Sequence, residues 1–195
     1  EPQDQLGGKN MWTSVNDYKQ FANTFYSWTR DFSSVVYDGT HSDKRSDLIT
    51  YQSYNEFSRG INSIPSSDAN YTDNYKHIRR TNLLLQNAEA YAKPEDIKQY
   101  IGEAYFFRAY SYFDLLQLYG DVIITKKPLD ITDPEMKVKR NDRSEVVDLI
   151  IDDLNHAVEN LPAFKELTTE EEGRISKEGA QAFLSRVALY EGTWQ

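Results

Sequence analysis

The chain has 195 residues, enough for one domain with a substantial core or for part of a larger domain. Its 22 Lys and Arg against 31 Asp and Glu give a formal net charge of −9, which argues against nucleic acid as a partner, because phosphate binding relies on basic side chains. The absence of Cys excludes disulfides and thiolate metal sites. The sequence contains no run of roughly 18 apolar residues, the length that would predict a membrane-spanning helix.

The first predicted helix follows a polar stretch at residues 1–11. Ser14 and Asp17 have the spacing of a helix N-cap and its acidic third-position partner, which together satisfy free amide groups at a helix start. Apolar and aromatic residues then follow at helical spacing to about Thr29: Val15, Tyr18, Phe21, Ala22, Phe25, Tyr26 and Trp28. The sequence therefore predicts an amphipathic helix that packs an aromatic face.

Residues 31–70 lack helical periodicity and are predicted to form a long loop insertion. Turn signals such as Asp38-Gly39 occur throughout them. A loop of this length in a compact domain is usually functional or carries short elements of its own. Its aromatic residues, Tyr37 and Tyr54 among them, are interleaved with Asp, Asn, Ser and Arg, a mixture that suits a carbohydrate site. The alternative for any single Tyr is that it fills a helix interface.

The central predicted helix, residues 94–120, is apolar or aromatic on most of its sides. Its apolar residues cannot be placed on one narrow stripe at 3.6 residues per turn, so we expect the helix to be buried between neighbours. Pro94 opens it and Gly120 ends it. Its polar residues drift round the helix and make no full solvent face: Arg108, Ser111, Asp114 and Gln117.

Three more helices are predicted, one before the central helix and two after it. Asp142 with Glu145, and Ser176 alone, are the expected N-caps of the last two. After the central helix, residues 122–133 are predicted to form a short apolar segment and then an irregular crossing. The three helices span about 71–91, 142–161 and 178–191.

An internal repeat supports this layout. The pattern Ala104-x-Phe106-x-Arg108-x-x-x-Tyr112 corresponds to Ala182-x-Leu184-x-Arg186-x-x-x-Tyr190, a shift of 186 − 108 = 78 residues. Each copy is the second helix of a hairpin, at about 71–120 and 142–192. The predicted fold is therefore all-α, with tetratricopeptide-like helical hairpins and long irregular loop insertions. Arg108 and Arg186 are expected to be partly buried and paired with a carboxylate or with helix carbonyls; ligand contact is the alternative.

No catalytic or metal-binding pattern is found. There is no Gly-x-Ser-x-Gly motif, and His41, His77 and His156 are far apart without metal-ligand spacing. The neighbouring carboxylates of Asp152 and Asp153 point in different directions on a helix and do not face each other as a glycosidase pair would. We expect a binding protein, not an enzyme, with no cofactor and no metal.

The central helix resembles that of a known family. Residues 108–115, Arg-Ala-Tyr-Ser-Tyr-Phe-Asp-Leu, and residues 119–122, Tyr-Gly-Asp-Val, are similar to the characteristic helix of the SusD/RagB family of surface lipoproteins, which capture nutrients for an outer-membrane transporter. The pattern Tyr75-x-x-Ile78-x-x-x-Asn82 and the helix at 145–162 also resemble the family. One departure is that Pro128 comes later than the Pro that the family usually places directly after Gly-Asp-Val.

The resemblance implies a fold, a function and a location. Residues 1–195 would be the N-terminal portion of a SusD-like domain. The protein would bind an oligosaccharide or polysaccharide for delivery to a SusC-type TonB-dependent transporter. It would sit at the outer membrane, exposed on the cell surface, through a lipid anchor on a Cys upstream of Glu1. Two alternatives remain open: a tetratricopeptide-like protein-interaction module without glycan binding, and a family member that captures peptides.

Five residues are candidate ligand contacts, because they lie in loops where the family tends to place its site. Their rings would stack on the apolar face of a sugar, and their polar groups would orient its hydroxyls. The family often has Trp where Tyr71 stands, so a recognition ring there would be altered. The five candidates are Tyr37, Asp43, Tyr54, Asn70 and Tyr71.

Overall fold

The structure is a computed structural model that describes residues 11–30, 60–61, 63–130 and 132–194. The chain divides into two units, Glu1–Phe25 with Ala69–Gln195, and Tyr26–Asp68. In the first unit the elements are α-helices and short 3-10 helices, and β-type pairing among the described residues is limited to an isolated antiparallel bridge between Val122 and Asn141. The predicted all-α class is confirmed.

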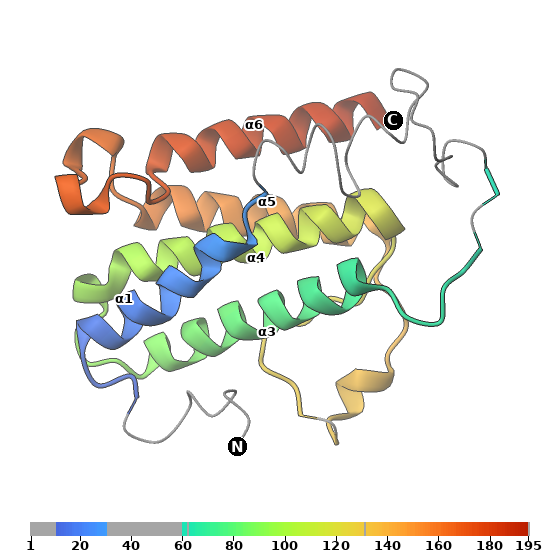
Figure 1. Cartoon of the computed structure of the whole chain (residues 1–195), viewed down its shortest axis with the longest axis horizontal. Coiled ribbons are helices and arrows are strands. Elements are labelled where there is room, and N and C mark those ends of the chain that lie inside the picture. The colour runs from blue at the N-terminus through green and yellow to red at the C-terminus, as the bar shows by residue number, and fades with distance from the viewer. Residues whose placement is uncertain (1–10, 31–59, 62, 131, 195) are drawn as a thin grey trace, which may run out of the picture. The chain divides into compact units, whose positions relative to one another are not determined.

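Four long helices lie side by side in chain order, each antiparallel to the next, as Figure 1 shows. α4 packs between α3 and α5, and α6 packs on α5. A shorter helix, α1, contacts both α3 and α4. The helices are α1 (Val15–Asn23), α3 (Ala69–Glu89), α4 (Lys98–Tyr119), α5 (Arg143–Asn160) and α6 (Lys177–Trp194). The 3-10 helices are η2 (Thr24–Trp28), η4 (Pro94–Ile97), η5 (Pro134–Lys137), η6 (Phe164–Glu166) and η7 (Thr169–Glu171).

The core is built around α4, as its sequence predicts. Thirteen of its 22 residues are buried, including the polar Arg108 and Ser111. Its aromatic side chains meet rings from both ends of the chain: Phe107 lies 5.7 Å from Phe25 before α3, and Phe113 lies 5.4 Å from Phe183 on α6. A helix without a solvent face is stable only between neighbours, which explains why the other helices are arranged about it.

The helix starts follow local capping rules. Ser14 and Asp17 form a capping box at the start of α1, and Asp142 and Glu145 form one at the start of α5. The hydroxyl of Ser176 accepts a hydrogen bond from a backbone amide in the first turn of α6. All three predicted N-caps are confirmed.

Three details differ from the sequence predictions. The α-helical part of the first helix ends at Asn23, and η2 continues the turn to Trp28. Pro94 opens η4, and α4 begins four residues later at Lys98. Arg186, expected to be partly buried like Arg108, is exposed. Arg108 is buried where α5 supplies a carboxylate to pair with it, whereas no described residue supplies one to Arg186.

The predicted loop insertion at residues 31–70 falls largely outside the described residues. Of it the structure describes 60–61 and 63–70, where Gly60 has a positive φ of 66° and Ile64 is 99% exposed. The predicted boundaries of the hairpins, about 71–120 and 142–192, and of the insertion stay predictions.

Candidate functional site

A pocket of about 460 Å³ lies between the first half of α3 and the chain that follows α4. The α3 wall is formed by five side chains. Tyr71, Tyr75 and Arg79 are four residues apart and therefore form one row along the helix, and Thr72 and Lys76 form the next row. The pocket thus has two aromatic rings at one end of a wall and basic groups farther along it.

The opposite wall is the crossing segment, residues 122–129. Alternate residues of it line the pocket, which is the spacing of an extended chain: Ile123, Thr125, Lys127 and Leu129. Val122, at its start, is fully buried and its carbonyl accepts a hydrogen bond from the backbone N–H of Asn141. The side chain of Asn141 in turn accepts from the backbone N–H of Ile124. One end of the wall is therefore fixed to the start of α5.

Tyr75 ties the two walls together. Its hydroxyl donates to the carbonyl of Ile123 at 2.8 Å and accepts from the backbone N–H of the same residue at 2.9 Å. Burial, with a contribution from Tyr71, raises the pKa of the Tyr75 hydroxyl, so the group stays protonated and able to donate. The ring of Tyr75 is consequently fixed in place on the α3 wall of the pocket.

The middle of the crossing segment is held from α3 and α4. The Nδ2 of Asn82 donates to the carbonyl of Thr125 at 2.9 Å and to that of Lys127 at 3.3 Å. Tyr112 uses its hydroxyl as Tyr75 does: it donates to the carbonyl of Thr125 and accepts from its N–H at 2.8 Å. Two buried side chains thus satisfy the backbone of a segment that has no secondary structure of its own.

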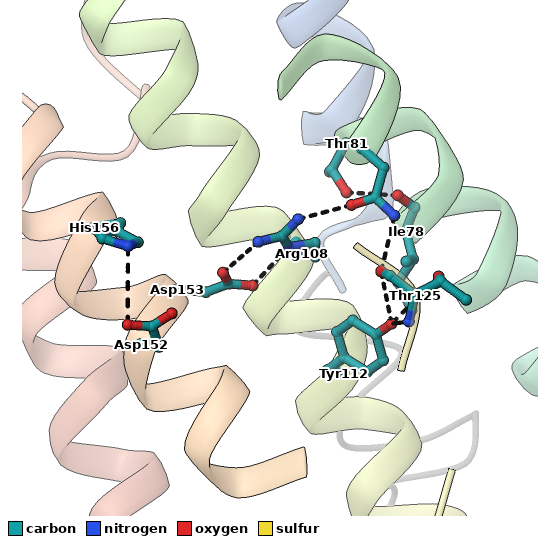
Figure 2. A network of polar contacts seen from close by, with 9 residues as sticks. Ile78, Thr81, Arg108, Tyr112, Thr125, Asp152, Asp153 and His156 are labelled. Carbon is teal, nitrogen blue, oxygen red and sulfur yellow. Dashed lines mark hydrogen bonds and ion pairs between the residues drawn. The ribbon is translucent and has the colours of Figure 1, made fainter. Parts of the chain in front are cut away.

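A buried ion pair between Arg108 and Asp153 supports Asn82. Figure 2 shows Arg108 between Asp153 on one side and α3 on the other. Its Nη1 donates to Oδ1 of Asn82 at 2.8 Å, and its other two nitrogens bind the carboxylate of Asp153. Burial opposes the charge of Arg108, but the bonds and charge of Asp153 outweigh it and raise the pKa of Arg108. Burial raises the pKa of the Asp153 carboxyl, and Arg108 opposes that rise. The predicted structural role of Arg108 is confirmed.

The five candidate contacts are placed differently. Tyr71 lines the pocket, with its ring 4.8 Å from that of Tyr75 and 5.2 Å from that of Tyr119. Asn70 is the neighbouring residue at the start of α3 and does not line the pocket; its carbonyl accepts from Asn74 at 2.8 Å. The other three candidates, Tyr37, Asp43 and Tyr54, lie outside the described residues. All five stay predicted ligand contacts.

Sequence reasoning did not identify most of the pocket. Arg79 carried a usable signal, because it is eight residues after Tyr71 and four after Tyr75 on a predicted helix. Ile123 and Leu129 carried a weaker one, alternation over a short apolar stretch. What the sequence could not supply is that these two stretches, more than 40 residues apart, face each other.

A metal site and a membrane-spanning helix are two further features that the described parts of the chain could carry. Within them, no cluster of three His, Asp or Glu side chains is arranged to hold a metal ion. His156 lies 3.8 Å from Asp152 and 3.7 Å from Glu159, and its ring packs against Tyr105, a helix-surface arrangement. Among the described helices, none combines the length and the apolar character that a membrane span needs.

Comparison with known proteins identifies the family. The model of a SusD-like family, described as starch-binding and associating with the outer membrane, matches residues 7–189. SusD-like protein P38 of Formosa agariphila is 33% identical over 133 residues, which cover 66% of this chain and 25% of that protein. A SusD-like protein from Bacteroides fragilis has a solved structure that is 28% identical and superposes with a TM-score of 0.79, over 98% of this chain and 38% of that one.

A further solved structure is similar over a shorter stretch. It is that of a laminarin-binding SusD-like protein, 30% identical with a TM-score of 0.62, over 70% of this chain and 29% of that one. The chain thus spans about a quarter of the P38 relative and well under half of these solved structures. The helices match the tetratricopeptide-like arrangement of SusD-like structures, which confirms the predicted fold class. The family match over residues 7–189 shows that the chain belongs to the SusD-like family.

Proposed function

We propose that this chain is part of a cell-surface protein that binds an oligosaccharide or polysaccharide and delivers it to a SusC-type TonB-dependent transporter. In this proposal the protein is held at the outer membrane by a lipid anchor upstream of residue 1 and carries out no catalysis. The family description, starch-binding and associating with the outer membrane, supports carbohydrate binding and the location. The transporter and the anchor are implied by family membership alone.

The observation that carries the proposal is the pair of rings in the pocket. Tyr71 and Tyr75 lie 4.8 Å apart on one wall of a 460 Å³ pocket, and hydrogen bonds from the opposite wall fix Tyr75. Fixed aromatic rings suit the apolar face of a sugar ring because they lose little freedom when the sugar binds. Thr72 and Thr125 add hydroxyl groups that can bond to those of the sugar.

The proposed contacts extend beyond this pocket. Tyr71 is the contact that the geometry favours, and Asn70 lies beside it at the start of α3. Tyr37, Asp43 and Tyr54 stay proposed contacts on sequence grounds. Since family members are much longer than this chain, the remainder of such a protein can also contribute to the site.

Affinity electrophoresis in gels that contain a polysaccharide tests the proposal. The panel includes starch and laminarin, both neutral glucans, together with acidic and sulfated glycans. We expect at least one of them to retard the 195-residue chain. Tyr71→Ala should then weaken binding roughly tenfold, since a lost ring stack costs about 1 kcal/mol or more. Phe164→Ala is the matched control, because Phe164 is an exposed ring outside the pocket.

The results distinguish the alternatives. Retardation that Tyr71→Ala weakens and Phe164→Ala leaves intact supports the pocket as the binding site. Retardation that neither substitution changes would support glycan binding but remove Tyr71 from the site. If no glycan retards the chain, glycan capture by this chain is wrong, and a peptide ligand or a protein-docking role becomes the better explanation.

A further inference from the structure

Three basic side chains line the pocket: Lys76, Arg79 and Lys127. No Asp or Glu is found among the described residues that line it. The chain as a whole has the opposite character, with a formal net charge of −9. The pocket is therefore a locally basic site on an acidic protein, and a neutral sugar would make no use of that charge.

Not all of this charge is already neutralised. The Nζ of Lys76 lies 2.8 Å from the carboxylate of Asp73, one turn earlier on the same helix. Arg79 is exposed, and within the described parts of the chain its guanidinium makes no hydrogen bond or ion pair. Asn82 binds the main-chain carbonyl of Lys127 at 3.3 Å, which fixes the backbone from which that side chain extends. Arg79 is thus available to a ligand. It lies on α3, opposite the crossing segment whose backbone Asn82 fixes.

Rings and charge are arranged along one line. Tyr71, Tyr75 and Arg79 occupy successive positions of one i, i+4 row of α3, so a sugar stacked on the rings would present its substituents to the guanidinium. A guanidinium presents paired N–H donors that match the geometry of a carboxylate or a sulfate group, and such charge-assisted bonds are stronger than bonds to a hydroxyl.

We propose that the pocket selects an oligosaccharide that carries carboxylate or sulfate groups, with Arg79 as the residue that recognises the anion. This inference rests on the proposed glycan binding and specifies its ligand class. Tyr71 and Tyr75 hold the sugar, and Arg79, with Lys127 from the opposite wall, sets the preference for an anionic sugar over a neutral one.

The net charge of the chain makes this selection testable. A protein with a charge of −9 repels a polyanion at long range, so a polyanion has no reason to bind it nonspecifically. At about 0.1 M salt such repulsion is screened beyond roughly 10 Å, whereas contacts within a pocket persist. Retardation by an anionic glycan therefore reports a local basic site.

The experiment compares matched pairs of glycans by affinity electrophoresis of the 195-residue chain. One pair is a sulfated galactan and its desulfated form; the other is a polyuronate and its carboxyl-reduced form. We expect the anionic member of at least one pair to bind more tightly than its neutral counterpart, on the order of tenfold for one charge-assisted contact. The pair that shows the difference identifies the anionic group as sulfate or carboxylate.

Arg79→Gln is the test variant and Arg186→Gln its control. Both residues are exposed on helices and both substitutions change the net charge equally, but Arg186 lies on α6 outside the pocket. We expect Arg79→Gln to remove the preference for the anionic glycan and Arg186→Gln to leave it unchanged. Far-ultraviolet circular dichroism of both variants checks that their helices are intact.

Each remaining outcome overturns the inference. If the anionic and neutral members of each glycan pair bind equally well, the pocket does not recognise the anionic group. The same conclusion follows if Arg79→Gln and Arg186→Gln lose affinity equally. In both cases glycan binding itself stands. If no glycan of either kind binds, the proposed function fails as well. These results are distinguishable, because the first two leave retardation by a glycan in place.

Discussion

The guanidinium of Arg108 forms two hydrogen bonds with the carboxylate of Asp153, 2.8 Å from Nε and 2.6 Å from Nη2. The side chains are 6% and 0% exposed. Because Arg108 also donates to Asn82, and Asn82 donates to the backbone of Thr125, the pair joins α4 and α5 to one wall of the pocket. A contact in the helical core thereby helps to shape the candidate binding site.

Removing one charge of this pair should destabilise the fold strongly. Asp153→Asn leaves Arg108 buried without a counter-ion, and breaking a buried pair in this way typically costs about 3 to 5 kcal/mol. Asp152→Asn is the control, because the adjacent Asp152 is 60% exposed and its loss should change stability by no more than about 0.5 kcal/mol. Urea unfolding followed by circular dichroism measures both. Similar midpoints for the two variants would show that the pair contributes little to stability.

The hydroxyl of Tyr75 should matter for both stability and binding. Tyr75→Phe removes the donor and the acceptor that Ile123 uses, and leaves the backbone groups of Ile123 without that partner. We expect a loss of about 1 to 3 kcal/mol in unfolding free energy, and weaker glycan binding because the two walls of the pocket are no longer joined. Urea unfolding and affinity electrophoresis measure the two effects.

A second tyrosine gives the control for this substitution. Tyr105, on α4, packs its ring against His156, and its hydroxyl makes no hydrogen bond with a described residue. Tyr105→Phe should therefore change neither stability nor binding appreciably. If Tyr75→Phe behaves in the same way, the double hydrogen bond to Ile123 does not hold the wall of the pocket in place.

Local signals in the sequence predicted the helices because each depends on residues close together in the chain. The capping boxes of α1 and α5 need only Ser14 with Asp17 and Asp142 with Glu145, three residues apart. The burial of α4 follows from its lack of a polar face. Such features can be predicted without knowing the tertiary contacts that surround them.

The pocket could not be predicted in this way. Its second wall has no secondary structure, and side chains 48 and 43 residues earlier, Tyr75 and Asn82, fix its position. The exposure of Arg186 could not be predicted from local sequence either. Its repeat position matches that of Arg108, but burial depends on whether an acid on a covering helix is present, and the pattern within one helix does not carry that information.

The stability of the protein should fall as the pH is lowered from 6.5 to 4, in part through His77. Burial lowers the pKa of His77 to about 4, with the nearby Asp73 opposing the shift. The unfolded chain, with an ordinary pKa near 6.5, therefore binds more protons than the folded chain in this range, so the contribution of His77 is complete above pH 6.5 and is lost as pH falls toward 4. We expect His77 to account for a loss of about 1 to 2 kcal/mol in unfolding free energy, because partial exposure of its side chain reduces the effect of burial.

Urea unfolding at several pH values measures this loss. His77→Gln should flatten the dependence of the unfolding free energy on pH between 4 and 6.5. His156→Gln is the control, because His156 is 44% exposed beside Asp152 and Glu159. A slope that His77→Gln leaves unchanged would rule out His77 as its source.

Gly102 packs α4 against the end of α5 so tightly that even an alanine side chain there should destabilise the protein. A Cβ there would lie 2.9 Å from Cγ of Leu161, 3.0 Å from its backbone N and 3.1 Å from Cβ of Asn160. Two of these atoms belong to, or are attached directly to, the backbone, so they cannot turn away as the end of a flexible side chain could. Alanine would gain about 1 kcal/mol of helix propensity, but the forced separation of two packed helices should cost more, for a net loss of about 1 to 3 kcal/mol.

Gly192 on α6 supplies the matched control, since a Cβ there meets no atom within 4 Å. Gly192→Ala should stabilise the protein by up to about 1 kcal/mol, because alanine restricts the unfolded chain and favours the helix. Thermal unfolding of the two variants therefore should move the midpoint in opposite directions. If Gly102→Ala also raised the midpoint, α4 and α5 would have room to separate at this crossing, and close packing there would not limit the position of α5 against the central helix.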